Sequence, residues 1–218
     1  MKKNIFLNRI LTDDYVIQLL KRIHLLKMKA EIYPDMKDIF RAFEISNLDD
    51  VKVVIFGQDP YYLPGVADGL AFSTKQSKTP ASLKNIFKEL KNEYPDLIIE
   101  TNDLTSWAKQ GVLLANTSLT VMKNMPNSHA YLGWSYVIKE AIEYINENRH
   151  NVIFLLWGNQ ANKFKSLIDE EKHHVLMSAH PSPLSANNGF FGNNHFKIAN
   201  QILTDNFQKE IDWNLKKE

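Results

Sequence analysis

The segment GQDPYYLPGVADGLAFS, which begins at Gly57, places an amide, a carboxylate and two phenol rings directly after a short apolar run. Glycine and proline are the residues that a turn requires, and both are present. A turn has no need of Gln58, Asp59, Tyr61 and Tyr62 close to one another. Such groups bind and activate small molecules, so we interpret the segment as a candidate binding or catalytic site.

Short apolar runs and helical patterns alternate along most of the chain. Helical patterns lie at 82–94, 132–149 and 161–172, and another at 195–207 follows the last apolar run. The apolar runs predict buried strands at Val51–Phe56, Gly111–Ala115, Asn151–Trp157 and His174–Ser178. This alternation predicts an α/β fold with a parallel sheet that helices cover on both faces.

Polar groups follow each of these strands. In an open parallel sheet, ligands bind beyond the carboxyl ends of the strands. The residues that reach this edge are, in chain order, Gln58 with Asp59, Asn116, Gly158 with Asn159, and His180. The topology therefore predicts that an acid, an amide and an imidazole meet at one edge of the sheet.

Each of these three groups also has an ordinary structural explanation. Asp-Pro is a common loop dipeptide, which would account for Asp59. Asn116, followed by Thr117 and Ser118, would serve as a cap for the next segment. His180 lies in SAHPSPLSA, where prolines stiffen the backbone around it. Their expected convergence at one edge favours a functional site over three unrelated structural roles.

Other chemistries have weaker support. A metal site would draw on His173, His174, His180 and His195 with Asp59 or Asp68. These residues show no tight signature such as H-E-x-x-H, and adjacent side chains of a strand point to opposite faces. The first strand is not followed by G-x-G-x-x-G, and no G-x-S-x-G elbow marks a serine nucleophile. Because these signatures are missing, we expect no metal, no dinucleotide cofactor and no serine nucleophile.

The composition is that of a globular protein. The chain has 218 residues, of which 44% are hydrophobic and 23% charged, so we expect a single domain over 1–218. Amphipathic patterns predict that residues 1–50 form a helical part of it. The formal net charge of +1 gives no overall attraction to a polyanion. A nucleic acid would therefore be held by local hydroxyls, backbone N–H groups and a few lysines.

The chain contains no cysteine, which suits a reducing cytosol but is compatible with any compartment. The N-terminus MKKNIFLNRILTDDYV begins like a signal peptide, yet Asn8, Arg9, Asp13 and Asp14 interrupt it early. No long apolar run follows. We therefore expect a cytoplasmic protein without a membrane span.

Several segments in a fixed order carry a resemblance to a known family. GQDPYY…GLAFS, LLANTSLTV and HPSPLSA resemble the three core motifs of the uracil-DNA glycosylases. YPDMKDIFRAF, TPASLKNIF, FLLWG and GFFGNNHF are also similar to that family, and the similarity extends from Tyr33 to Phe207. It implies a three-layer α/β/α sandwich with a central four-stranded parallel sheet. It also implies hydrolysis of the bond between uracil and deoxyribose in DNA, with no cofactor.

The resemblance implies a role for each residue around the base. Asp59 would stabilise the sugar cation and orient or deprotonate the attacking water, and His180, as a neutral imidazole, would donate a hydrogen bond to uracil O2. Phe72 would stack on the uracil ring. Asn116 would offer an acceptor to N3–H and a donor to O4, a pattern that cytosine reverses. Tyr61 would block the C5 methyl group of thymine.

The resemblance also implies how DNA is held. Leu184 would enter the base stack that the flipped nucleotide leaves, as apolar wedges do in other proteins that kink DNA. Ser82, Ser182 and Ser185 would bind the flanking phosphates through hydroxyls and backbone N–H groups. The backbone at Gln58 would help to hold the base.

The chain departs from the family pattern at Tyr62 and Asp68, where relatives often have histidine. Neither residue is assigned to bond cleavage, so these departures put the rate in question more than the reaction. One alternative is a uracil-DNA-binding protein with little or no cleavage, which the retained acid, amide and imidazole oppose. Another is a glycosylase for mismatched thymine or a different damaged base, which Tyr61 opposes.

The expected partner is uracil-containing DNA, either single- or double-stranded. Phosphate binding makes salt-dependent affinity an expectation. Relatives are targets of DNA-mimicking inhibitor proteins, so the resemblance implies susceptibility to such inhibitors. We expect a monomer.

Overall fold

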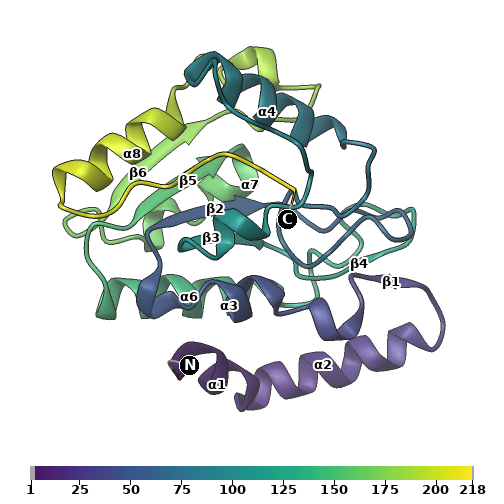
Figure 1. The fold of residues 1–218 in the computed structure, drawn as a ribbon. Coiled ribbons are helices and arrows are strands. Elements are labelled where there is room, and N and C mark those ends of the chain that lie inside the picture. Colours follow the sequence, from purple (N-terminus) through teal and green to yellow (C-terminus); the bar gives the residue numbers. More distant parts are fainter. Residues whose placement is uncertain (1–2, 218) are drawn as a thin grey trace.

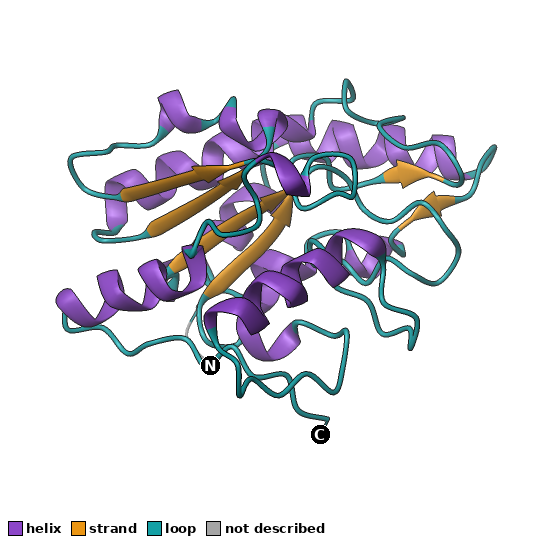
Figure 2. Ribbon diagram, turned by 90° about the horizontal axis from the view of Figure 1, so that it is seen from above, coloured by secondary structure: helices purple, strands orange, loops and turns teal. Residues whose placement is uncertain are grey.

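The computed structural model describes residues 3–217, and a parallel sheet forms its centre (Figure 1). The sheet has four strands in the order β3-β2-β5-β6. Their bounds are Val53–Gly57 (β2), Val112–Asn116 (β3), Ile153–Trp157 (β5) and His174–Ser178 (β6). The predicted strands are thereby confirmed, with small shifts at their ends. The prediction that His174–Ser178 is buried is wrong, because β6 lies at an edge of the sheet and none of its residues is buried. Figure 2 shows them side by side and pointing in one direction, as the parallel pairings require.

Helices cover both faces of this sheet, which confirms the three-layer α/β/α sandwich. Figure 1 shows α4 and α8 on one side and α3 and α6 on the other, with α1 and α2 beyond them. Their bounds are Ile5–Leu11 (α1), Asp14–Lys27 (α2), Arg41–Ile45 (α3), Ala81–Glu93 (α4), Trp134–Asn148 (α6) and His195–Asp205 (α8). Strands β2, β3 and β5 consist of buried residues throughout because both of their faces are covered. Across the described residues, every helix is too short or too polar to span a membrane.

The predicted helices at 82–94, 132–149 and 195–207 are confirmed as α4, α6 and α8. The prediction at 161–172 is wrong, because this segment holds only the end of α7 (Asn159–Asn162) and a 3₁₀ turn (Lys165–Leu167). The backbone N–H groups of Phe164 and Ile168 each bond to the carbonyl three residues back, at 3.0 Å. Both side chains are buried, and their spacing of four residues imitates the apolar face of a helix.

Further elements were not expected from the sequence. Strand β1 (Ile32–Tyr33) pairs antiparallel with β4 (Val121–Met122), and both are too short to show an alternating pattern. Helix α5 (Thr105–Ala108) has only four residues, about one turn, which is too short for a helical pattern. The C-terminal segment crosses the molecule and buries Trp213, whose carbonyl accepts a hydrogen bond of 3.1 Å from the Trp107 indole.

Two buried carboxylates of α4 accept hydrogen bonds from backbone N–H groups at the start of α8 and just before it. Glu89 accepts a hydrogen bond of 2.8 Å from the backbone N–H of Gly192, and Glu93 accepts one of 2.6 Å from that of Lys197. Glu93 is well placed there because Lys197 lies in the first turn of α8, where backbone N–H groups have no partner within the helix. Burial raises the pKa of Glu93 to about 7, although the backbone hydrogen bonds oppose this shift.

We expect Glu93→Gln to make the free energy of unfolding depend less on pH. The pKa of the folded protein, about 7, lies above the ordinary value of 4.5. The contribution of Glu93 to stability is therefore fully present below the ordinary value and is lost as the pH rises through about 7, a loss of about 3 kcal/mol. Glutamine keeps an oxygen for the Lys197 N–H but does not ionise.

Urea unfolding at about pH 5 and about pH 8 would measure this difference. The control is Glu143→Gln, which removes an exposed carboxylate from α6. Wild type and Glu143→Gln should lose stability alike between these values, whereas Glu93→Gln should lose less. An equal loss in all of the proteins would mean that Glu93 is not the source.

Candidate active site

The ends of β2 and β3 bring the first predicted site residues together. Gly57 at the end of β2 is paired with Asn116 at the end of β3. A Cβ atom on residue 57 would lie 2.2 Å from the Asn116 side-chain oxygen, so glycine leaves the room that this amide occupies. The carbonyl of Gln58 then accepts hydrogen bonds from the Ser118 N–H at 3.0 Å and the Thr117 hydroxyl at 2.9 Å. The loops that follow the two strands are thereby fixed to each other.

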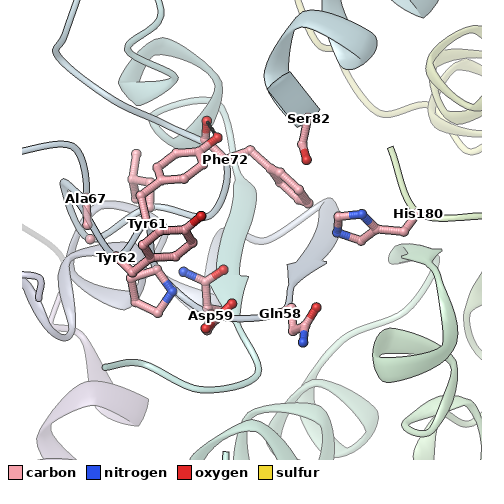
Figure 3. A pocket seen from close by; sticks show the side chains of 12 residues that line it. Gln58, Asp59, Tyr61, Tyr62, Ala67, Phe72, Ser82 and His180 are labelled. Carbon is pink, nitrogen blue, oxygen red and sulfur yellow. Dashed lines mark hydrogen bonds between the residues drawn. The ribbon is translucent and has the colours of Figure 1, made fainter. Parts of the chain in front are cut away.

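A cavity of about 120 Å³ opens at this edge of the sheet. Its wall includes every residue predicted to bind or cleave the substrate base, namely Gln58, Asp59, Tyr61, Phe72, Asn116 and His180, and also Ser82 and Tyr62. Figure 3 shows His180 across the cavity from the two tyrosines, with Gln58 and Asp59 between them. For scale, an apolar cavity of about 150 Å³ binds benzene. The cavity therefore suits one six-membered ring with polar edges.

Asp59 is held by a residue that the sequence did not single out. Its Oδ2 atom accepts a hydrogen bond of 2.7 Å from the backbone N–H of Asn127. Asn127 has a φ of 62°, in the left-handed region that asparagine tolerates better than most residues, and its side chain hydrogen-bonds with Gln58. Burial raises the pKa of the Asp59 carboxyl, and the bond from Asn127 opposes this shift. The carboxylate is thus oriented at the wall of the cavity.

The imidazole of His180 has a defined tautomer. Its Nδ1 atom accepts a hydrogen bond of 3.0 Å from the backbone N–H of Ser182, so Nδ1 carries no proton. Burial lowers the pKa of His180, which favours a neutral ring with its proton on Nε2. Gly158 permits this arrangement, because a Cβ atom there would lie 2.7 Å from the His180 Cβ atom. The ring therefore has one N–H group, on Nε2, to donate.

Phe72 forms an aromatic surface beside the imidazole. Its ring centroid lies 5.8 Å from that of Trp157 and 5.8 Å from that of His180. The backbone of Phe72 has a φ of 64°, which is rare for a bulky residue. Its carbonyl accepts a hydrogen bond of 3.0 Å from the Tyr61 hydroxyl. The two predicted aromatic residues are therefore coupled to each other.

The loop after β6 projects Leu184 into solvent, and the residue is 93% exposed. The Ser185 hydroxyl donates to the His180 carbonyl at 2.8 Å, and its oxygen lies 2.9 Å from that of Ser182. Leu184, Ser182 and Ser185 thus lie outside the cavity wall, on the loop that carries His180.

Helix α4 is joined to this loop. Ser82, at the start of α4, lines the cavity. One turn further along, the Asn85 side chain donates a hydrogen bond of 2.8 Å to the Pro181 carbonyl. The predicted DNA-binding residues therefore belong to two segments that contact each other.

The histidines do not gather into a metal site. Within residues 3–217, no group of three or more His, Asp or Glu side chains is placed to hold a metal ion. His195 Nδ1 accepts a hydrogen bond of 3.0 Å from the Trp157 indole, and His173 Nδ1 accepts one of 3.3 Å from the Val152 N–H. These two histidines therefore have structural partners.

The fold and the site define an α/β protein whose sheet edge carries a pocket for one small ring, beside an acid and a neutral imidazole. Residues 43–204 match the family model described as the uracil DNA glycosylase superfamily. This match spans most of the chain and includes every residue that lines the cavity. The chain belongs to the uracil DNA glycosylase superfamily.

Named relatives agree with this assignment. A protein of Escherichia coli O81 (strain ED1a) named uracil-DNA glycosylase is 53% identical over 184 residues, which are 84% of this chain and 80% of that protein. A protein of the same name from Shigella dysenteriae serotype 1 (strain Sd197) has the same identity and coverage. The crystal structure of mimivirus uracil-DNA glycosylase covers 96% of this chain and 85% of its own, with a TM-score of 0.86 and 29% identity. A variant of that viral enzyme has been solved in complex with UGI.

Proposed function

We propose that this chain is a uracil-DNA glycosylase, a DNA-repair hydrolase that cleaves the N-glycosidic bond of deoxyuridine in DNA and leaves an abasic site. The observation that carries the proposal is the cavity itself, where Asp59, Asn116 and His180 surround the space for one ring. The curated relatives at 53% identity bear the same name. The roles of the individual residues below are part of the proposal.

The uracil leaves the base stack before it reaches the cavity. An enzyme cannot reach this base within a duplex, so it flips the nucleotide out, at a cost of a few kcal/mol. Leu184, which is exposed on the loop after β6, fills the vacated stack. Ser82, Ser182 and Ser185 hold the flanking phosphates, and the hydroxyls that now bond within the loop turn to phosphate oxygens.

Three kinds of contact recognise uracil: stacking on its ring, hydrogen bonds to its edge, and steric exclusion of a methyl group. Phe72 stacks on the ring, and the Asn116 amide pairs with N3–H and O4 at its edge. Cytosine presents the opposite donors and acceptors, so each hydrogen bond would become a contact of like groups, which a site of this kind rejects strongly. Tyr61 stands where the methyl group of thymine would lie.

Bond cleavage places positive charge on the sugar and negative charge on the uracil. Asp59, oriented by the Asn127 N–H, stabilises the sugar cation and orients or deprotonates the water that attacks it. The Nε2–H group of His180 donates to uracil O2 as charge develops there. The hydrogen bond from the Ser182 N–H to Nδ1 supports this role, because it leaves the ring proton on Nε2.

The direct test uses a labelled oligonucleotide with one uracil, incubated with the protein in EDTA and then treated with alkali to break abasic sites. We expect a break at uracil and none in a matched thymine oligonucleotide. Tight binding to uracil DNA without a break would instead favour a protein that keeps the pocket without cleaving. Both single- and double-stranded substrates belong in this test.

We expect Tyr61→Ala to reduce discrimination between uracil and thymine. Removal of the ring opens space where the thymine methyl group would lie, and a pocket that merely accommodates a methyl group discriminates by only about 10- to 200-fold. The ratio of the excision rates on uracil and on mismatched thymine should therefore fall into this range. Tyr61→Phe is the control, because it keeps the ring and removes only the hydroxyl bond to Phe72. If Tyr61→Ala gains no activity on thymine, the proposed role of Tyr61 is wrong.

We further propose that a DNA-mimicking inhibitor protein binds this chain. The support is the viral enzyme of the same fold, which was solved with UGI. Inhibition of uracil excision by added UGI, with stoichiometric loss of activity, would test this. Full activity in excess UGI would contradict it.

A further inference from the structure

An ion pair lies behind the cavity, and the proposed mechanism does not involve it. Arg41 of α3 contacts Asp68, with 3.1 Å between Nη1 and Oδ2. The exposed fractions of their side chains are 13% and 8%, so both charges are largely removed from water. Breaking such a pair is costly, because the partner that remains is a buried charge without compensation.

Asp68 organises the turn that contains Phe72. Its Oδ1 atom accepts a hydrogen bond of 3.1 Å from the Leu70 N–H, and its Oδ2 atom accepts one of 2.7 Å from the Ser73 hydroxyl. The Ser73 oxygen in turn accepts one of 3.0 Å from the Leu104 N–H. The carboxylate therefore holds the backbone on both sides of Phe72.

Arg41 connects this turn to two other elements. Besides the carboxylate, it donates to the Asp68 carbonyl at 2.9 Å and to the Thr105 hydroxyl, at the start of α5, at 2.7 Å. The turn also lies directly against α3. A Cβ atom on Gly69 would lie 2.9 Å from the Arg41 Cβ atom and 2.2 Å from the Asp38 carbonyl oxygen. The guanidinium is thus the point at which the turn, α3 and α5 meet.

The backbone of Phe72 needs such support. Its φ of 64° lies in a region that bulky residues rarely adopt, and it persists only where surrounding contacts fix it. The Tyr61 hydroxyl holds the Phe72 carbonyl from the side of the cavity. Asp68 and Ser73 hold the turn from behind, so the ring is fixed from both directions.

We propose that Arg41 and Asp68 are positioning residues, which hold the Phe72 ring in the place where it stacks on the flipped uracil. This inference rests on the proposed function of Phe72 and adds the residues that set its geometry. Neither Arg41 nor Asp68 lines the cavity, so they act through Phe72 rather than on the substrate.

The test compares Arg41→Met, Asp68→Asn and the double variant with wild type. Excision kinetics on a uracil oligonucleotide give kcat and KM, and inhibition by free uracil reports on the pocket without DNA. Arg41→Met should raise the inhibition constant of uracil about tenfold and lower kcat similarly. KM for DNA should change by less than about twofold, because other residues bind the phosphates. The double variant should bind uracil better than Arg41→Met does, because it leaves no buried carboxylate unpaired.

Two controls separate positioning from a general loss of stability. Arg9→Met breaks the Arg9–Glu140 ion pair, far along the chain from the turn, and should leave uracil inhibition unchanged. All assays run well below the thermal midpoint measured for each variant. If Arg41→Met does not fold, Arg41→Lys, which keeps the charge but not the forked geometry, and Asp68→Asn provide the same comparison.

Unchanged uracil inhibition in folded Arg41 and Asp68 variants would overturn the proposal, provided that Phe72→Ala weakens uracil binding. The proposed function fails in a different way. If wild type excises no uracil, or if Phe72→Ala binds uracil as wild type does, the role of Phe72 is wrong, and the positioning role falls with it.

Discussion

Asp59→Asn should slow uracil excision by about 10²- to 10⁴-fold, the range that a positioned acid or base contributes. Asparagine has the same shape and keeps an oxygen for the Asn127 N–H, so the loop should stay in place. It has no negative charge to stabilise the sugar cation and cannot accept a proton from water. KM for DNA should change little, because the residues proposed to bind the phosphates lie on other segments. Single-turnover rates on a uracil oligonucleotide would measure the effect.

The pH dependence of the excision rate is a second test of the role proposed for Asp59. In its proposed role Asp59 acts as a carboxylate, so excision should slow as the pH falls through its pKa. Burial raises this pKa, so the loss should begin at a higher pH than for an exposed aspartate. The residual activity of Asp59→Asn should lack this dependence. Asp96→Asn, at an exposed position, is the control. A rate of Asp59→Asn within about tenfold of wild type would exclude the proposed role.

His180→Ala should lower the excision rate by about 10²- to 10³-fold, as the loss of one donor to a developing oxyanion does. The variant removes the Nε2–H group that is proposed to donate to uracil O2. His180→Gln is the informative comparison, because it restores an N–H donor of similar reach and should recover part of the rate. If both variants are equally slow, the ring matters for its packing against Phe72 rather than for its hydrogen bond.

The neutral state of His180 can be tested separately. Burial lowers its pKa below the usual 6.5, which favours the neutral ring at neutral and higher pH. The rate of wild type should therefore not fall as the pH rises from about 6.5 to about 9. An imidazolium donor would instead lose its proton, and the rate would decline with rising pH. Nitrogen NMR of the His180 ring should show Nδ1 without a proton.

The edge of the sheet could be predicted from the sequence because strands leave strong local signals. Each strand is a compact apolar run, and the residues after it reach the carboxyl edge whatever the path of the loops. Asp59, Asn116 and His180 therefore share one cavity although they are far apart in the chain. A local pattern was misleading at 161–172. Buried residues there have helical spacing, but they lie on separate tight turns.

The contacts that orient these groups could not be predicted in this way. Asn127 reaches Asp59 through a loop with no periodic pattern and through a left-handed backbone. Its position in KNMPNS indicates a turn but not what the turn approaches. Arg41 and Asp68 belong to segments whose pairing depends on how α3 packs, which no local spacing encodes. The order of strands in the sheet thus indicates which polar groups meet at its edge. Tertiary packing determines how those groups are oriented.

The close approach of Gly57 to Asn116 has a consequence for how this pocket can change over evolutionary time. A single methyl group on residue 57 would enter the space of the Asn116 amide oxygen, which is proposed to read the base. Every other amino acid adds at least that atom, so the position is closed to mutation while Asn116 keeps its place. A substitution at residue 57 in any lineage therefore has to follow a change in Asn116 or in the loops that carry it.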